Sequence, residues 1–215
     1  GALGEILTEK GGNLNLGVPG IMSLGAIGGL MGSFFYETRV ENPSAAVCLF
    51  VTLLSALALS VLGGLIYSFL TITLRANQNV TGLTLTIFGC GFANFYGSSL
   101  NTLAGGVGQI SLPITSAAFR AVLPSLRNTP LFNTLGWLVY LSIAFAIVMW
   151  YFLSRTRAGL NLRAVGESAA TADAAGINVT LYKYLAICVG AALTGLGGLY
   201  YTMDYIKGTW ASGGS

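Results

Sequence analysis

Amide side chains are the groups in this sequence best suited to binding a polar molecule. Asn13 and Asn15 lie in a glycine-rich stretch that leads into an apolar run, and Asn77 and Gln78 precede another apolar run. Amides both donate and accept hydrogen bonds. If each pair stands where a helix is interrupted, the four side chains line a path for a polar solute. The alternative for each pair is a turn at the surface.

The polar stretch 159–183 is a second candidate site, because it separates two apolar segments and carries signals for ordered structure. Ser168 is suited to an N-cap, since its hydroxyl can accept from a free N–H of the first turn. The alanine-rich run 169–175 favours helix, and Gly176 stands where a left-handed C-cap residue belongs. The pattern predicts a helix of about two turns, roughly 10 Å long. An ordinary amphipathic turn is the alternative.

Residues for covalent catalysis are missing from the apolar part of the sequence. The 215 residues include no His, which excludes a Ser–His dyad and the HExxH zinc motif. No pair of acidic residues lies within an apolar segment, which argues against an aspartyl protease and against a proton-driven carrier. The three cysteines, Cys48, Cys90 and Cys188, all fall in apolar segments and are expected to be core residues. We therefore expect no catalytic residue, no metal site and no cofactor.

The composition identifies a membrane protein. Hydrophobic residues make up 54% of the chain and charged residues only 8%, whereas soluble domains carry about 25% charged residues. The net charge of +3 is scattered over loops, so it does not indicate nucleic-acid binding. Because lipid-exposed backbone must be satisfied within each span, we expect an all-α polytopic transmembrane helix bundle with re-entrant or broken helices and no β-sheet.

Apolar segments and charged turns predict about five full spans. The uncharged segment 44–74 is either one long helix or a helix broken at Gly63 and Gly64, and glycines four residues apart in the first span predict a close-packed face. The positive-inside rule places residues 154–183 and 75–79 inside, and residues 37–43, 101–130 and 204 onward outside. The expected spans cover residues 21–36, 44–74, 80–96, 131–153 and 184–203.

Three blocks of the sequence resemble the nucleoside and simple-sugar branch of ABC-transporter permeases, which belongs with the ribose and branched-chain amino acid permeases. The first is GEILTEKGGNLNLGVPGIM at residues 4–22, in which Pro19 stands where that family usually has Glu. The second is RANQNVTGL at 75–83. The third is GLNLRAVGE at 159–167, followed by AAGI at 174–177. They occur in the family's order and cover most of the chain.

The resemblance implies a permease subunit of an ABC importer that moves nucleosides or related simple sugars. It implies three protein partners: a cytoplasmic ATP-binding subunit, a second permease subunit and an extracytoplasmic solute-binding protein, often a lipoprotein. Residues 1–215 would form one permease domain truncated at both ends, in a bacterial-type plasma (inner) membrane. Residues 154–183 would be the cytoplasmic coupling loop that docks on the ATPase, with contacts from Arg163, Glu167, Ser168, Asp173 and Gly176.

Two other classes of function remain open at this point. A facilitative channel or secondary carrier would need no ATPase, and a structural membrane subunit would need no polar path. The ordered polar stretch argues against the channel, and the amide pairs argue against the structural subunit. The chain itself has no GxxxxGK[ST] phosphate loop, so it is not expected to bind ATP.

Overall fold

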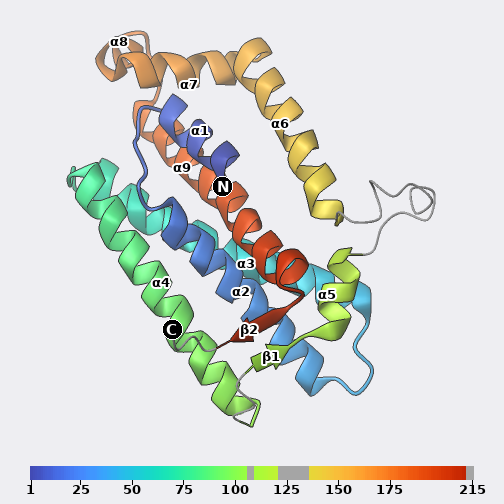
Figure 1. Cartoon of the computed structure of the whole chain (residues 1–215). Helices are drawn as coiled ribbons and strands as arrows, with labels where there is room; N and C mark the ends of the chain where they lie inside the picture. Colours follow the sequence, from blue (N-terminus) through green and yellow to red (C-terminus); the bar gives the residue numbers. More distant parts are fainter. Residues whose placement is uncertain (106–108, 121–135, 212–215) are drawn as a thin grey trace.

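The fold is a bundle of helices whose long members cross one another at glycine-rich contacts (Figure 1). The computed structural model describes residues 1–105, 109–120 and 136–211. The helices within these residues are α1 (Ala2–Lys10), α2 (Val18–Arg39), α3 (Ala45–Ser68), α4 (Gln78–Leu103), α5 (Pro113–Arg120), α6 (Trp137–Arg155), α7 (Arg157–Glu167), α8 (Ala169–Ala174) and α9 (Val179–Tyr200). Two π-helical turns, η1 (Phe69–Thr73) and η2 (Tyr201–Tyr205), extend α3 and α9.

Four helices in the described part of the chain are long and apolar enough to cross a membrane: Val18–Arg39, Ala45–Thr73, Trp137–Arg155 and Val179–Tyr205. Helix α4 is not among these four, although its 26 residues give about 39 Å at 1.5 Å per residue. The all-α membrane bundle is thus confirmed. Of the five expected spans, the one at residues 80–96 corresponds to a longer helix that falls short on apolarity.

Helix α3 continues through Gly63 and Gly64, so of the two alternatives left open one long helix is confirmed and the break is wrong. Both glycines are buried, and a Cβ on Gly64 would lie 2.6 Å from the Ala191 side chain of α9. The pair therefore allows close packing rather than a break. The irregularity comes five residues later, where the helix widens into the π-helical turn η1.

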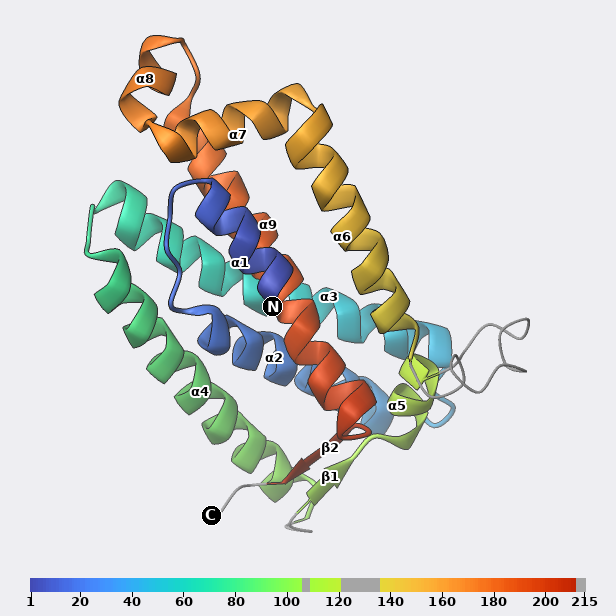
Figure 2. The ribbon, with the colours of Figure 1, turned by 45° about the horizontal axis from the view of Figure 1, so that its top comes forward.

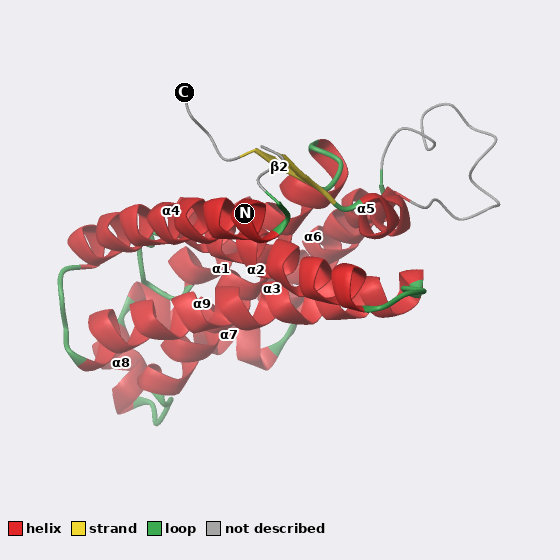
Figure 3. Ribbon diagram, turned by 90° about the horizontal axis from the view of Figure 1, so that it is seen from below, coloured by secondary structure: helices red, strands yellow, loops and turns green. Residues whose placement is uncertain are grey.

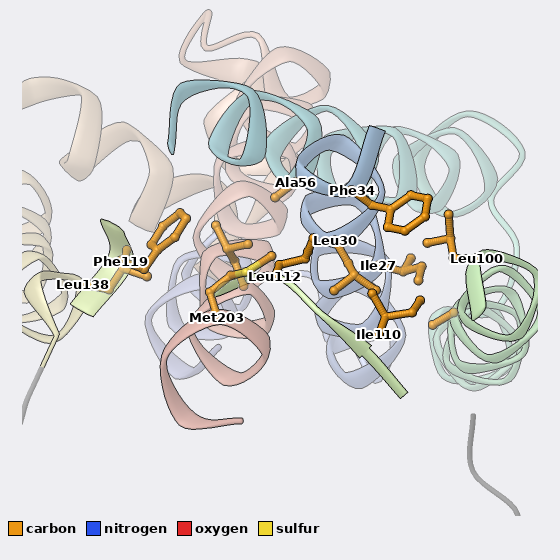
Figure 4. Close-up of a cluster of buried hydrophobic side chains, with 12 residues drawn as sticks. Ile27, Leu30, Phe34, Ala56, Leu100, Ile110, Leu112, Phe119, Leu138 and Met203 are labelled. Carbon is orange, nitrogen blue, oxygen red and sulfur yellow. The ribbon is translucent and has the colours of Figure 1, made fainter. Parts of the chain in front are cut away.

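Helix α2 is the centre of the bundle and packs against α3, α4 and α9. A Cβ on Gly25 or Gly29 would press on α9, and one on Gly28 or Gly32 would press on α3. The expected close-packed face is confirmed, and its glycines contact two neighbouring helices, α3 and α9. Figure 4 shows the largest apolar cluster, which draws residues from α2 to α6, from α9, from β1 and from η2.

The expectation of no β-sheet is wrong, because two short strands pair at one margin of the bundle (Figure 3). Strand β1 (Gln109–Ser111) runs antiparallel to β2 (Thr209–Ala211), with Ile110 opposite Trp210. Each strand has three residues, whereas a strand needs about 9–11 to cross a membrane. The strands follow α4 and η2 in sequence and pair with each other, and a Cβ on Gly97 of α4 would meet Trp210, so β2 packs beside the last turns of α4.

The two ends of the bundle differ in the elements they carry. Helices α7 and α8 and the turn between α3 and α4 lie toward one end, and β1, β2 and α5 lie toward the other (Figure 2). The expected irregular region 101–129 is partly replaced by the end of α4, by β1 and by α5. Its remainder, with the expected start of a span at residue 131, lies outside the described residues.

Candidate functional site: a buried amide pair and a capped segment

The link between α1 and α2 is a backbone segment that breaks the helical path inside the bundle. Helix α1 ends at Lys10, and two residues later Gly12 has φ +80°, the left-handed conformation that favours glycine. The Gly12 N–H donates to the Glu9 carbonyl at 2.9 Å, and the Asn13 N–H donates to the Thr8 carbonyl at 3.2 Å, which is a Schellman motif. We call residues 11–17 the α1–α2 loop. The expected irregular backbone before the first long helix is confirmed.

The side chain of Gln78, at the start of α4, holds this loop through both of its polar atoms. Its Oε1 accepts from the backbone N–H of Leu14 at 2.9 Å, and its Nε2 donates to Oδ1 of Asn13 at 3.3 Å. The loop and the start of α4 are 64 and 65 residues apart in sequence at these two contacts. Asn13 and Gln78, here called the amide pair, therefore join the two polar stretches that the sequence places far apart.

Two hydroxyl groups that sequence reasoning missed also hold the loop. The Tyr67 hydroxyl of α3 donates to the Leu14 carbonyl at 2.6 Å, and the Thr86 hydroxyl of α4 donates to the Leu16 carbonyl at 2.8 Å. Tyr67 is fully buried, and it is the only tyrosine in the uncharged segment 44–74. Because a buried tyrosine hydroxyl usually needs a partner, its presence there was a usable signal.

One donor in the amide pair is left without a partner. Asn13 is 1% exposed, and its Nδ2 is buried with no hydrogen-bond partner. Exchanging the positions of Oδ1 and Nδ2 in the Asn13 amide would not give this donor a partner. The Leu14 N–H needs an acceptor, so the Oε1 atom of Gln78 must face it and the NH₂ group of Gln78 must face Asn13. The atom of Asn13 that accepts from this NH₂ group must then be Oδ1, which leaves Nδ2 without a partner. An unpaired buried donor costs about 1–3 kcal/mol. A bound molecule that offers an acceptor to Nδ2 of Asn13 would remove this cost, which favours its binding here.

The other two predicted pathway residues occupy different positions. Asn15 is buried, and its Oδ1 accepts from the Gly17 N–H at 2.9 Å, which shapes the turn into α2. Asn77 is exposed and caps α4 by accepting from the N–H groups of Asn79 and Val80. The structure therefore brings Asn13 and Gln78 into contact, keeps Asn15 buried on the same loop, and places Asn77 at the surface.

The polar segment after α6 is more ordered than the sequence predicts. Thr156 caps α7 by accepting from the Gly159 N–H at 3.0 Å, so most of the stretch expected to be loop is helical. Helix α7 buries Gly159, Leu162 and Val165. The three-residue spacing of these positions, together with the capping threonine, was the signal for this helix.

The short capped helix is confirmed as α8. The Ser168 hydroxyl accepts from the Thr171 N–H at 3.4 Å. Gly176 has φ +82°, and the N–H groups of Gly176 and Ile177 donate to the carbonyls of Asp173 and Ala172 at 2.9 and 3.0 Å. This second Schellman motif fixes the exit from α8. The residues expected to contact a partner are all exposed: Arg163, Glu167, Ser168, Asp173 and Gly176.

Two cavities elsewhere in the bundle are apolar and do not include the amide pair. They have volumes of about 540 and 480 Å³ and lie between α6 on one side and α1 and α9 on the other. Their linings, which include Leu141, Phe145, Met149 and Leu193, contain no Asn, Gln, Asp or Glu. They are therefore poorly suited to recognising a polar solute.

Comparison with known proteins places these features in a family. The family model described as the branched-chain amino acid transport system permease component matches residues 1–213. The putative glucose ABC transporter permease protein TsgC13 of Haloferax volcanii is 32% identical over 98% of this chain and 60% of its own length. The guanosine ABC transporter permease protein NupQ of Bacillus subtilis is 30% identical over 93% of this chain and 61% of its own length.

A third relative, the nucleoside ABC transporter permease protein NupC of Lactococcus lactis subsp. cremoris, is 29% identical over 93% of this chain. The chain spans about three fifths of the length of these relatives. No solved structure matches it. On the match to the family model and to these relatives, the chain belongs to the family of branched-chain amino acid transport system permease components, and it is a multi-pass membrane protein.

Proposed function

We propose that this chain forms the solute pathway of an ABC importer for nucleosides or related simple sugars, and that a separate ATP-binding subunit drives it. The observation that carries the proposal is the buried amide pair on a broken helix, with Nδ2 of Asn13 lacking an acceptor. Sugars and nucleosides present hydroxyl and carbonyl oxygens that such a donor can bind. The names of the relatives, which include guanosine, nucleoside and glucose permeases, support this solute class.

Asn15, Asn77 and Gln78 take different parts in this pathway. Gln78 and Asn15 shape the loop that presents Asn13, as their hydrogen bonds indicate. Asn77 lies at the exposed end of α4, where it would meet a solute only at the mouth of the pathway. Backbone outside regular helix is stable at membrane depth only when protein or water forms its hydrogen bonds. Here the side chains of Gln78, Tyr67 and Thr86 hydrogen-bond to backbone groups of the loop.

The ATP-binding subunit would dock on α7, α8 and the turn after them, in residues 154–183. Arg163 and Glu167 of α7 and Ser168, Asp173 and Gly176 around α8 are exposed and available to it. Capping at both ends of α8 makes this segment stiff, and a stiff link transmits the motion of a partner better than a flexible one. The chain also has no phosphate-binding loop of its own, which fits a division of labour with a separate ATPase.

Charge distribution supports an orientation in a bacterial-type plasma (inner) membrane. Arg75 lies in the turn between α3 and α4, and Arg155, Arg157 and Arg163 lie at α6 and α7, toward the same end of the bundle (Figure 2). By the positive-inside rule this end faces the cytoplasm. The end with β1, β2 and α5 would then meet an extracytoplasmic solute-binding protein or lipoprotein. A second permease subunit would complete the pathway.

The experiment is uptake by the full-length permease reconstituted in proteoliposomes with its ATP-binding subunit and its solute-binding protein. We expect ATP-dependent uptake of labelled guanosine or uridine, with competition by other nucleosides and by ribose. Asn13→Ala should raise the KM for uptake by about tenfold, equivalent to 1.4 kcal/mol. The matched control is Asn79→Ala, since Asn79 is exposed in the first turn of α4.

Two results would overturn the proposal. Uptake that equilibrates without ATP would assign the protein to the facilitative channels or secondary carriers, which the relatives' ABC permease names do not favour. Equal KM values for Asn13→Ala and Asn79→Ala would remove the amide pair from the pathway.

A further inference from the structure

The capped segment and the α1–α2 loop touch through glycine backbone. A Cβ on Gly166 of α7 would overlap the carbonyl oxygen of Lys10 and lie 3.2 Å from the Gly12 nitrogen. Conversely, a Cβ on Gly12 would lie 3.0 Å from Cα of Gly166. The atoms that would be met belong to backbone, so no side chain can rotate away. Helix α7 therefore rests directly on the end of α1.

Asn13 is the residue that follows this contact, and its position is fixed on the α1 side. The Schellman motif at Gly12 ties the Asn13 N–H to the Thr8 carbonyl. A displacement of Gly12 by α7 would therefore carry Asn13 with it. Gly12 and Asn13 are joined by a single peptide unit, so Asn13 has little freedom to move independently of Gly12.

The other side of the loop is held to the long helices by side-chain hydrogen bonds at Asn13, Leu14 and Leu16, and by close backbone packing of Gly17 against Gly82 of α4. Gln78, Tyr67 and Thr86 hold Asn13, Leu14 and Leu16 by single hydrogen bonds of 2.6 to 3.3 Å. Two segments in backbone-on-backbone contact shift little relative to each other when one of them is displaced. Segments joined by side-chain hydrogen bonds can shift more, because the side chains rotate and the bonds re-form. Next to Asn13, the loop is thus held by backbone contact on the α7 side and by side-chain hydrogen bonds on the side of α3 and α4.

We propose that Gly166 is a positioning residue, and that α7 sets the place of Asn13 through the contact of Gly166 with Lys10 and Gly12. This inference rests on the proposed function and extends it. A movement of the docking segment, produced by the ATP-binding subunit, shifts the α1–α2 loop against α4 and alters what Nδ2 of Asn13 can reach. By linkage, solute bound at Asn13 shifts the docking segment in return.

The test is Gly166→Ala in the complete reconstituted transporter, with Gly91→Ala as the matched control. Both variants replace a glycine within a helix, so both gain the same intrinsic helix propensity, about 1 kcal/mol. A Cβ on Gly91 of α4 meets no atom within 4 Å, whereas one on Gly166 meets the α1–α2 loop. The measurement is ATP hydrolysis as a function of guanosine or uridine concentration in the presence of the solute-binding protein.

We expect Gly166→Ala to assemble with the ATP-binding subunit and to keep its basal ATP hydrolysis. The solute concentration for half-maximal stimulation should rise at least fivefold, within the range typical of coupling between sites. A purely structural role would lower the amount of folded complex and the amplitude of every activity, and would leave that concentration unchanged. Equal half-maximal concentrations in Gly166→Ala and Gly91→Ala would overturn the proposal.

A disulfide provides a second test that does not depend on how well Gly166→Ala folds. A Cβ on Gly11 would lie 3.3 Å from Cδ1 of Leu162, so cysteines replacing these two residues would face each other across the loop and α7. The first measurement is whether they form a disulfide, which requires Cβ atoms about 3.5–4.5 Å apart. In a background without other reactive cysteines, the oxidised pair should keep solute-stimulated ATP hydrolysis, because the two segments move together. Loss of stimulation on oxidation that is restored by reduction would show that they must separate, and would overturn the proposal.

The two proposals fail in distinguishable ways. If the unmodified transporter shows no ATP-dependent nucleoside uptake, the proposed function is wrong. If it transports and its ATPase responds to solute, but Gly166→Ala responds like Gly91→Ala or the oxidised cysteine pair loses stimulation that reduction restores, only the positioning role is wrong.

Discussion

The carboxylate of Glu37 accepts a hydrogen bond from the Thr115 hydroxyl at 2.8 Å, across 78 residues of sequence. The same carboxylate also accepts from the backbone N–H groups of Ile114 and Thr115 at 3.2 and 3.4 Å. It therefore satisfies free donors in the first turn of α5, where a negative charge also interacts favourably with the helix dipole. Glu37 of α2 fixes α5 at the end of the bundle that carries the strands.

Replacing Glu37 with Ala should loosen α5. Two backbone donors would lose their partner, at a cost of about 1–3 kcal/mol for each donor that water does not reach. We expect a lower melting temperature of the purified protein and faster proteolysis between β1 and α5. Glu41→Ala is the matched control, because Glu41 is exposed on the turn that follows α2. Identical melting curves for the two variants would contradict the role of Glu37.

Gln78→Ala should destabilise the α1–α2 loop. The substitution leaves the Leu14 N–H and the Asn13 amide without their partner, at a cost of about 1–3 kcal/mol for each group that water does not reach. We expect a lower melting temperature and faster hydrogen exchange in residues 11–17, measured by mass spectrometry. Asn79→Ala, one residue further along α4, should leave both unchanged. Normal exchange in Gln78→Ala would mean that the loop is held without the amide pair.

Tyr67→Phe tests the hydroxyl contact separately from packing. The ring is fully buried, and phenylalanine keeps its volume while it removes the donor to the Leu14 carbonyl. A net loss of about 1–2 kcal/mol in the free energy of unfolding is expected, as for other buried hydrogen bonds. Tyr205→Phe serves as the control because Tyr205 is 68% exposed. Equal stabilities of the two variants would show that the Leu14 carbonyl finds another donor.

The long helices could be predicted from the sequence because lipid imposes a simple rule on them. Uncharged segments bounded by charged turns indicated the spans, and the spacing of Gly25, Gly28, Gly29 and Gly32 indicated a close-packed helix. The same rule misled at the strands, because β1 and β2 satisfy part of their backbone by pairing with each other, which a rule about helical spans does not anticipate. It also says little about α4, which is long but less apolar than the other spans.

The candidate site was only half visible in the sequence. Asn13 was marked by the glycines around it and Gln78 by the apolar run that follows it, but nothing local could show that residues 65 positions apart hydrogen-bond to each other. Asn77 was grouped with them by proximity in sequence, and the structure uses its side chain as a helix cap instead. Caps are local, so Ser168 and Gly176 were identified correctly. The contact of Gly166 with Gly12 depends on how α7 crosses α1, which only the folded chain determines.

Gly176→Val is the prediction that tests the docking segment itself. Gly176 has φ +82°, and a Cβ there meets no atom within 4 Å. The cost of the substitution is therefore conformational, on the order of 1–2 kcal/mol for an L-residue in left-handed geometry, and no neighbouring side chain is displaced. The Schellman motif that ends α8 should open, while α2, α3 and α9 stay packed.

We expect Gly176→Val to uncouple ATP hydrolysis from uptake in the reconstituted transporter. Hydrolysis should continue, with reduced stimulation by solute, and uptake should fall by more than hydrolysis does. Gly176→Asn is the matched control, because asparagine tolerates the left-handed conformation better than valine does, and it should keep most of the coupling. A deletion of residues 168–173 should uncouple the two activities more severely. If Gly176→Val and the deletion both transport with a normal ratio of uptake to hydrolysis, the segment is only a connector and the ATP-binding subunit must dock elsewhere.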